Sequence, residues 1–249
     1  MDNWTFARSR MKDTFIFIFF SIVLVVSAGA QALPDKNPDR FQLGTKTVNI
    51  PPPEDFEDVT GRIKDDKGRF TADDAGGLLS LAVPEQIISR LNDNPLMPLD
   101  IYTKVKVDAS SRVADTSPEL YAAVVSEFEK NFSTLFDAKG KTVTDARRDI
   151  KDFVTRVSGK KSKVELSPVR NLGYFQKTEN VFSAMMLMTI EVNGNEVPMM
   201  VTVSLLRIND RLINAAVYKR QPTEQDFTLV SDFTKKWTAR IVEANRPKN

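Results

Sequence analysis

Long runs of mostly apolar residues mark the second half of the chain, and each is long enough for a β-strand. The runs cover 182–192, 196–208 and 212–219, and two short turn sequences, Asn193-Gly194 and Asn209-Asp210, separate them. Asn-Gly between two apolar runs is the strongest short-range signal for a tight β-hairpin. The sequence therefore predicts a three-stranded antiparallel meander of long strands.

Shorter alternating stretches predict further strands before and between the helices. They lie at 45–51, near the start of 76–94, at 99–108, at 164–166 and at 174–176. In 99–108 the apolar residues share one face, while Tyr102, Lys104, Lys106 and Asp108 take the other. This alternation is typical of a half-exposed strand.

Apolar residues at helical spacing predict three longer helices, besides a short one from about Pro84. The first follows Ser117-Pro118, because Ser caps a helix and Pro suits its first position. The second covers 145–157. The third follows Thr223, where Asp226 three residues later resembles a capping box. The apolar face of the first helix comprises Leu120, Val124, Phe128, Phe132 and Leu135.

Together these elements predict an α+β fold. Both faces of the meander are apolar near its first turn, and such a sheet needs cover on both sides. The amphipathic helices supply this cover, which gives an antiparallel β-sheet with helices on both faces, an α/β/α sandwich. We expect a single α/β domain over 45–245, followed by a short tail at 246–249.

The first 32 residues have the order of segments found in a secretory signal peptide. Three basic residues precede an apolar run at 15–26, and small residues follow it: Arg8, Arg10 and Lys12 come first, then Ala28, Gly29, Ala30 and Ala32. A basic, an apolar and a small-residue region in this order mark a cleaved signal. Cleavage is expected after Ala30 or after Ala32, and Met11 is an alternative start.

An uncleaved membrane tether is the alternative reading of this segment. The apolar run is shorter than the roughly 20 residues that a spanning helix needs, which favours cleavage. No later stretch is apolar for long enough to cross a bilayer, so no integral membrane span is expected after cleavage. We therefore expect an exported protein, most simply a periplasmic one, with residues 33–44 as a linker.

The composition limits the kinds of partner and of catalytic or metal-binding site that the chain can have. Hydrophobic residues make up 41% and charged residues 27% of the 249, an ordinary globular balance. The 35 Lys and Arg nearly balance the 33 Asp and Glu, which argues against a nucleic-acid partner. Because Cys and His are both absent, the chain has no disulfide, no thiolate and no imidazole for catalysis or metal binding. We assign no catalytic, cofactor-binding or metal-binding residue, and only carboxylate chemistry stays open.

Methionines gather in one stretch of the chain. Five of the eight lie between positions 185 and 200: Met185, Met186, Met188, Met199 and Met200. They fit core packing, a thioether site for Cu(I), or a pocket for an apolar ligand. Neighbouring residues of a strand point to opposite faces, so Met185 and Met186 point apart, which favours core packing.

Three charged segments are weaker candidates for a functional site. Residues 64–74 resemble a calcium loop, but aligning Gly68 with its required glycine places Ile63 where a carboxylate is needed. The basic run 158–163 is best read as a solvated loop. Asp145, Asp149 and Asp152 alternate with basic residues, and ion pairing on an exposed helix face explains them.

The order of elements resembles a known family. A strand leads into NIPPPEDFEDVT at 49–60, YTKVKVD at 102–108 forms another strand, and a long helix, the meander and a C-terminal amphipathic helix follow. This arrangement resembles the PsbP-like fold, seen in the extrinsic photosystem subunit, in Ran-binding relatives and in small exported bacterial proteins. The resemblance covers about residues 40–245 and departs from the family by a helical segment around 142–158. It implies an antiparallel sheet with helices on both faces and a role in binding or assembly, and it carries over no functional residue.

These observations lead to three functional hypotheses. The first is a non-enzymatic exported domain that binds a protein or cell-envelope partner. The second is a hydrolase that uses carboxylates alone, which requires two carboxylates facing each other about 5–10 Å apart in a cleft. The third is a carrier for an apolar ligand in a pocket beside Met186 and Met199. The sequence names neither the partner nor the oligomeric state.

Overall fold

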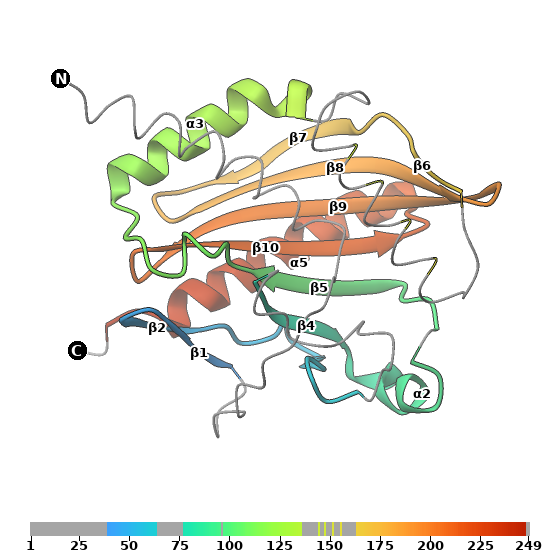
Figure 1. The fold of residues 1–249 in the computed structure, drawn as a ribbon, viewed down its shortest axis with the longest axis horizontal. Helices are drawn as coiled ribbons and strands as arrows, with labels where there is room; N and C mark the ends of the chain where they lie inside the picture. The colour runs from blue at the N-terminus through green and yellow to red at the C-terminus, as the bar shows by residue number, and fades with distance from the viewer. Residues whose placement is uncertain are drawn as a thin grey trace.

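An antiparallel β-sheet forms the centre of the protein (Figure 1). The computed structural model describes residues 39–63, 77–95, 97–135 and 163–247, together with Thr144, Arg147, Lys151 and Thr155. The strands are β1 Arg40–Leu43, β2 Lys46–Asn49, β3 Phe56–Asp58, β4 Leu78–Pro84, β5 Ile101–Lys106, β6 Val164–Leu166, β7 Arg170–Lys177, β8 Val181–Val192, β9 Asn195–Ile208 and β10 Arg211–Arg220. The helices are η1 Glu85–Ile87, α2 Ile88–Asp93, α3 Pro118–Leu135 and α5 Glu224–Ala244.

The strand order of the main sheet is β3-β4-β5-β10-β9-β8-β6, and β7 also pairs with β8. The predicted meander is its central part, since β8 pairs with β9 and β9 with β10. Both predicted turns are present. Asn193 and Gly194 have φ of 53° and 85°, and Asn209 and Asp210 have φ of 48° and 59°, the left-handed values that a type I′ hairpin turn requires.

One helix covers each face of the sheet, which confirms the predicted α/β/α sandwich. On one face α3 contributes Tyr121, Val124, Val125 and Phe128 to a core with β8 and β9. On the other, α5 contributes Val230, Trp237 and Ile241. In Figure 1 α5 runs behind β9 and β10, whereas α3 lies along β7 and β8. A smaller third cluster joins α2 to β4.

All five clustered methionines are buried, with at most 7% of any of them exposed. Met186, Met188 and Met199 lie in the core beneath α3, and Met185 and Met200 in the core beneath α5. The alternation along each strand thus divides the sulfurs between the two faces of the sheet. Core packing accounts for all of them.

The helix termini follow the sequence signals closely. The Leu120 N–H donates to Ser117 Oγ at 3.2 Å, and the Asp226 carboxylate accepts from the Thr223 N–H at 2.7 Å. The predicted face of α3 is partly wrong, because Leu120 is 40% exposed and Tyr121 is buried in its place. The predicted helix over 145–157 falls mostly outside the described residues.

Two other expectations need correction. Strand β5 is not half-exposed: Lys104 and Lys106 are only 8% and 5% exposed. The reason is its central place between β4 and β10, which sequence alternation alone does not reveal. The predicted linker over 33–44 overlaps strand β1, which pairs with β2 in a separate two-stranded sheet.

The β1–β2 hairpin is fastened to the end of α5. The Asn245 side chain accepts from the Asn49 N–H at 2.8 Å and donates to the Asn49 carbonyl at 2.6 Å, as a neighbouring strand would. Trp237 Nε1 donates to the Pro51 carbonyl at 3.0 Å. These bonds, with Leu43, Val48 and Ile50 in the core, hold the C-terminal half of α5 in a fixed position.

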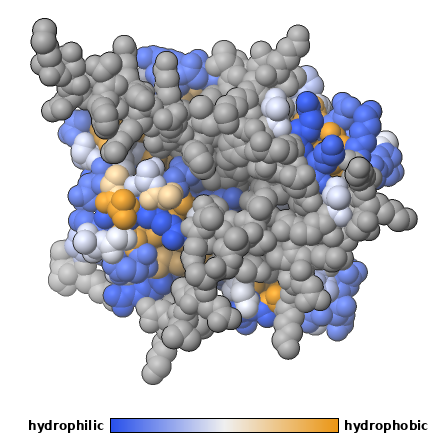
Figure 2. All heavy atoms as spheres, viewed as in Figure 1, coloured by the Kyte–Doolittle hydropathy of each residue, from blue (hydrophilic) through white to orange (hydrophobic). Residues whose placement is uncertain are grey.

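No helix in the described part of the chain is long and apolar enough to span a bilayer. Large apolar side chains at its surface are scattered: Val113, Leu120, Tyr174 and Leu229. On the face seen in Figure 2, the apolar areas of the described residues are small and lie beside hydrophilic ones.

Candidate functional site

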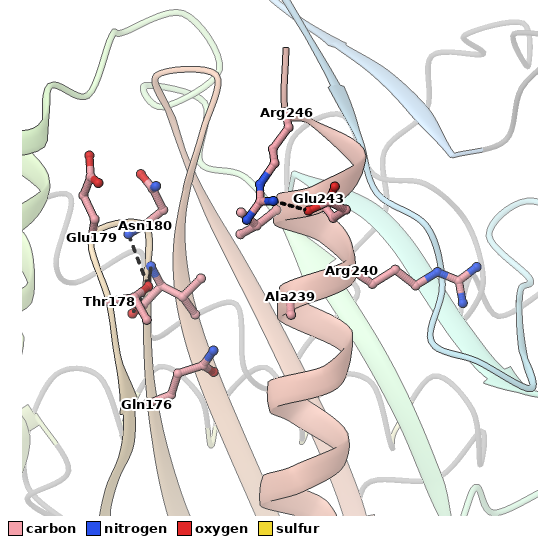
Figure 3. A pocket seen from close by; sticks show the side chains of 10 residues that line it. Gln176, Thr178, Glu179, Asn180, Ala239, Arg240, Glu243 and Arg246 are labelled. Atoms are coloured by element: carbon pink, nitrogen blue, oxygen red, sulfur yellow. Dashed lines mark hydrogen bonds and ion pairs between the residues drawn. The ribbon is translucent and has the colours of Figure 1, made fainter. Parts of the chain in front are cut away.

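A cleft of about 570 Å³ opens between the β7–β8 turn and the C-terminal half of α5. We call it the α5/turn cleft. Its less exposed lining residues are Gln176, Asn180, Val181 and Val242, and its exposed ones are Thr178, Glu179, Ala239, Arg240, Glu243 and Arg246. In Figure 3 the turn forms one wall and the helix the other, and Gln176 reaches from β7 toward α5.

The turn wall is built by side chains that cap backbone groups. Thr178 Oγ1 accepts from the Val181 N–H at 3.0 Å, which closes the turn. Asn180 is held from the neighbouring strand, because the Arg207 N–H donates to its carbonyl at 2.9 Å and Arg207 Nη1 donates to its Oδ1 at 3.0 Å. Arg207 is in turn fixed by the Asp210 carboxylate at 2.8 Å and by the Thr116 carbonyl. The wall is therefore held without help from a ligand.

Buried hydroxyl groups connect the cleft to the core between the sheet and α5. Ser183 Oγ donates to Gln176 Oε1 at 3.0 Å and lies 2.7 Å from Ser204 Oγ. Thr238 Oγ1 of α5 lies 3.1 Å from the same Gln176 oxygen. Ser183, Ser204 and Thr238 are fully buried. Satisfied polar groups of this kind specify how the helix sits on the sheet.

The charges around the cleft nearly cancel. Arg246 and Glu243 form an ion pair at 2.7 Å along the helix. Figure 3 shows Arg240 directed away from the turn. Burial raises the pKa of Asp39, and the charge of Arg240 partly offsets this rise. Glu179 adds a negative charge on the turn wall, so no strong field of either sign develops.

The cleft lacks the groups of a hydrolytic site. Among the described residues no three carboxylates gather where they could hold a metal ion. The cleft has one carboxylate on each wall, Glu179 and Glu243, and Arg246 already neutralises the second. Figure 3 shows Glu179 rising from the turn away from the helix. This arrangement does not supply the facing pair that glycoside hydrolysis requires.

The carboxyl groups whose pKa is raised most clearly by burial lie elsewhere. Burial raises the pKa of Asp108 to about 6, and the charge of Lys106 offsets only part of this rise. Burial also raises the pKa of Asp58, whose Oδ1 accepts from the Thr60 N–H at 2.7 Å. Neither lines the cleft. A perturbed pKa without a cleft gives no catalytic assignment.

The sequence candidates do not meet in this cleft. No methionine lines it, so the predicted Met-lined pocket does not coincide with it. The candidate calcium loop 64–74 and the acidic positions Asp145, Asp149 and Asp152 lie outside the described residues. Of the basic run 158–163 the structure describes Lys163, which pairs with Glu165 at 3.1 Å.

Sequence reasoning missed the residues that line the cleft. They come from two segments about 60 positions apart, 176–181 and 239–246, and neither carries a known motif. A weak signal was available, because Ala239 is a small residue on the exposed face of α5, a feature that it shares with Ala244. Small size at that place leaves the cleft open, but only the packed structure reveals what lies opposite.

Comparisons with known proteins add little to this picture. No family model matches the chain, and no curated protein matches it. A solved mutant of protein Mog1 is 9% identical and covers 83% of this chain and 92% of its own, at a TM-score of 0.30. The Saccharomyces cerevisiae Ran-binding protein Mog1p is 10% identical and covers 80% and 86%, also at 0.30. At this TM-score the likeness carries no argument, and the PsbP-like resemblance stays a prediction.

Proposed function

We propose that the protein is a non-enzymatic binding domain for a protein or cell-envelope partner and that this partner docks in the α5/turn cleft. In keeping with the signal-like residues 1–32, we propose that it acts after export, most simply in the periplasm. The observation that carries the proposal is a cleft with two fixed walls and exposed polar groups but no reactive pair.

The rest of the described surface supports this choice of site. Its large apolar residues are scattered, whereas a docking surface for an apolar partner is a contiguous patch. The cleft instead combines the apolar side chains of Val181 and Val242 with hydrogen-bonding and charged groups around them. A few polar groups around an apolar floor are typical of a site that binds one partner in one orientation.

Site-specific photo-crosslinking tests the proposal in the cells that produce the protein. A photoreactive phenylalanine analogue replaces Glu179 on the turn or Ala239 on α5, and a matched control replaces Leu229, which is 63% exposed near the start of α5. We expect both cleft positions to capture the same partner and Leu229 to capture none. Equal capture from all three positions, or none from the cleft, would contradict the proposal.

A further inference from the structure

We propose that the partner inserts an extended polypeptide segment into the α5/turn cleft, and that the side-chain amides of Gln176 and Asn180 donate hydrogen bonds to its backbone carbonyls. This inference rests on the proposed function, because it names the chemistry of the partner at the same site. Three observations carry it: the orientation of each amide, the balance of charge, and the apolar floor.

The orientation of the Asn180 amide is fixed by its arginine neighbour. Arg207 Nη1 lies 3.0 Å from Asn180 Oδ1. A guanidinium only donates, so it must face the oxygen of the amide and not the nitrogen. The Nδ2 group of Asn180 therefore points to the other side, where no described residue accepts from it. It stands as a donor on the turn wall.

The orientation of the Gln176 amide is fixed by the buried serines. Ser183 and Ser204 each have one hydroxyl proton, and their oxygens are 2.7 Å apart. If Ser204 donates to Ser183 and Ser183 donates to Gln176 Oε1, every proton has an acceptor. With the amide reversed, one fully buried hydroxyl would lack an acceptor, which is costly. Gln176 Nε2 is thus free to donate toward the cleft, and no described residue accepts from it.

Charge and composition favour a peptide over an anion or a sugar. An anion would need an uncompensated cation, but Glu243 engages Arg246 at 2.7 Å and Arg240 is directed away from the turn. Sugar sites commonly stack an aromatic ring on the sugar, and no aromatic residue lines the cleft. An extended peptide offers carbonyl acceptors every few ångströms, and an apolar side chain of it fits against the partly exposed Val242.

Isosteric variants test the donors without changing the shape of the cleft. Gln176→Glu and Asn180→Asp keep the oxygen that Ser183 or Arg207 uses but replace the donating NH₂ by an oxygen. Gln225→Glu and Asn195→Asp make the same changes at exposed positions outside the cleft. Thermal unfolding of all four variants checks that the fold is kept.

The probe is a displayed library of random linear peptides selected on the purified full chain. We expect the selected peptides to bind each cleft variant about tenfold more weakly or worse, and each control within about twofold of the parent protein. Peptide addition should also shift the side-chain amide NMR signals of Gln176 and Asn180. Peptides that bind cleft variants and controls alike would overturn the inference.

Three further outcomes distinguish a failure of this inference from a failure of the proposed function. If cleft crosslinking captures a partner but no peptide is selected, the peptide inference falls and the docking site stands. If a soluble N-acetylglucosamine oligosaccharide shifts the two amide signals and peptides do not, the partner is a glycan and the inference falls. If neither crosslinking nor selection yields a ligand, both proposals fall.

Discussion

At the scale of single residues, burial determines the structural role of the clustered methionines and of the two lysines in β5. Met186 and Met200 are fully buried on opposite faces of the sheet, where a flexible thioether fills space between strand and helix. The sequence predicted this role because alternation along a strand divides neighbouring residues between faces. It could not predict the burial of Lys104 and Lys106, because charge in a strand is ordinarily a sign of solvent.

Truncating one methionine tests the packing role. Met186→Ala should lower the free energy of unfolding by about 2–4 kcal/mol, because it leaves a cavity in a closed core. Met186→Leu nearly conserves volume and should cost less than about 1.5 kcal/mol. Urea unfolding measures both. A leucine variant as unstable as the alanine variant would show that the sulfur itself, and not its volume, matters.

Asp108 should make stability depend on pH in an unusual direction. Its pKa is raised to about 6 in the folded protein, whereas an unfolded Asp titrates at about 3.9. Between these values the folded state binds more protons at this group, so its contribution to the free energy of unfolding falls as pH rises. The whole change amounts to about 2–3 kcal/mol at most.

The variant Asp108→Asn isolates this contribution from the other carboxyl groups. The parent protein should lose stability relative to the variant as pH rises from about 4 to about 7. Urea unfolding at several pH values measures the difference. A difference that stays constant across this range, or that grows in the parent's favour, would refute the raised pKa.

At the level of elements, local signals explain most of the fold. Asn193-Gly194 and Asn209-Asp210 turn where predicted because few other residues adopt positive φ at low cost. Ser117 begins α3 because its hydroxyl oxygen accepts from the Leu120 N–H, and Thr223 begins α5 because its own N–H donates to the Asp226 carboxylate. Strand β2 lies within the predicted strand 45–51, whereas β1 was missed because its four residues follow a stretch rich in charges and proline and show no alternating pattern of their own.

The fastening of β1–β2 to α5 depends on one side chain. Asn245→Ala removes the bonds to the Asn49 N–H and carbonyl, and should cost about 1–2 kcal/mol of stability because these groups are only partly buried. Amide hydrogen exchange should quicken in residues 40–49 more than in β8 or β9. Asn195→Ala, at the far end of the sheet, is the control, and equal exchange in both variants would contradict the assignment.

For the whole molecule, the sandwich was predictable and the cleft was not. Periodicity identifies which residues face a core, so the α+β class and the covering helices follow from sequence. The cleft lies between α5 and a turn about 60 positions earlier in the sequence. Hydrophobic periodicity does not predict which distant segments pack side by side. The proposed function therefore depends on a feature that only the assembled fold displays.

Filling the cleft tests most directly whether the partner docks between α5 and the β7–β8 turn. Ala239→Phe places a ring between α5 and the β7–β8 turn, whereas Ala123→Phe places the same ring on an exposed face of α3. The quantity to measure is the affinity for the partner captured by crosslinking from Glu179. We predict that Ala239→Phe alone loses affinity for this partner by about tenfold or more, with unchanged thermal unfolding. Parent-like affinity in a folded Ala239→Phe protein would contradict it.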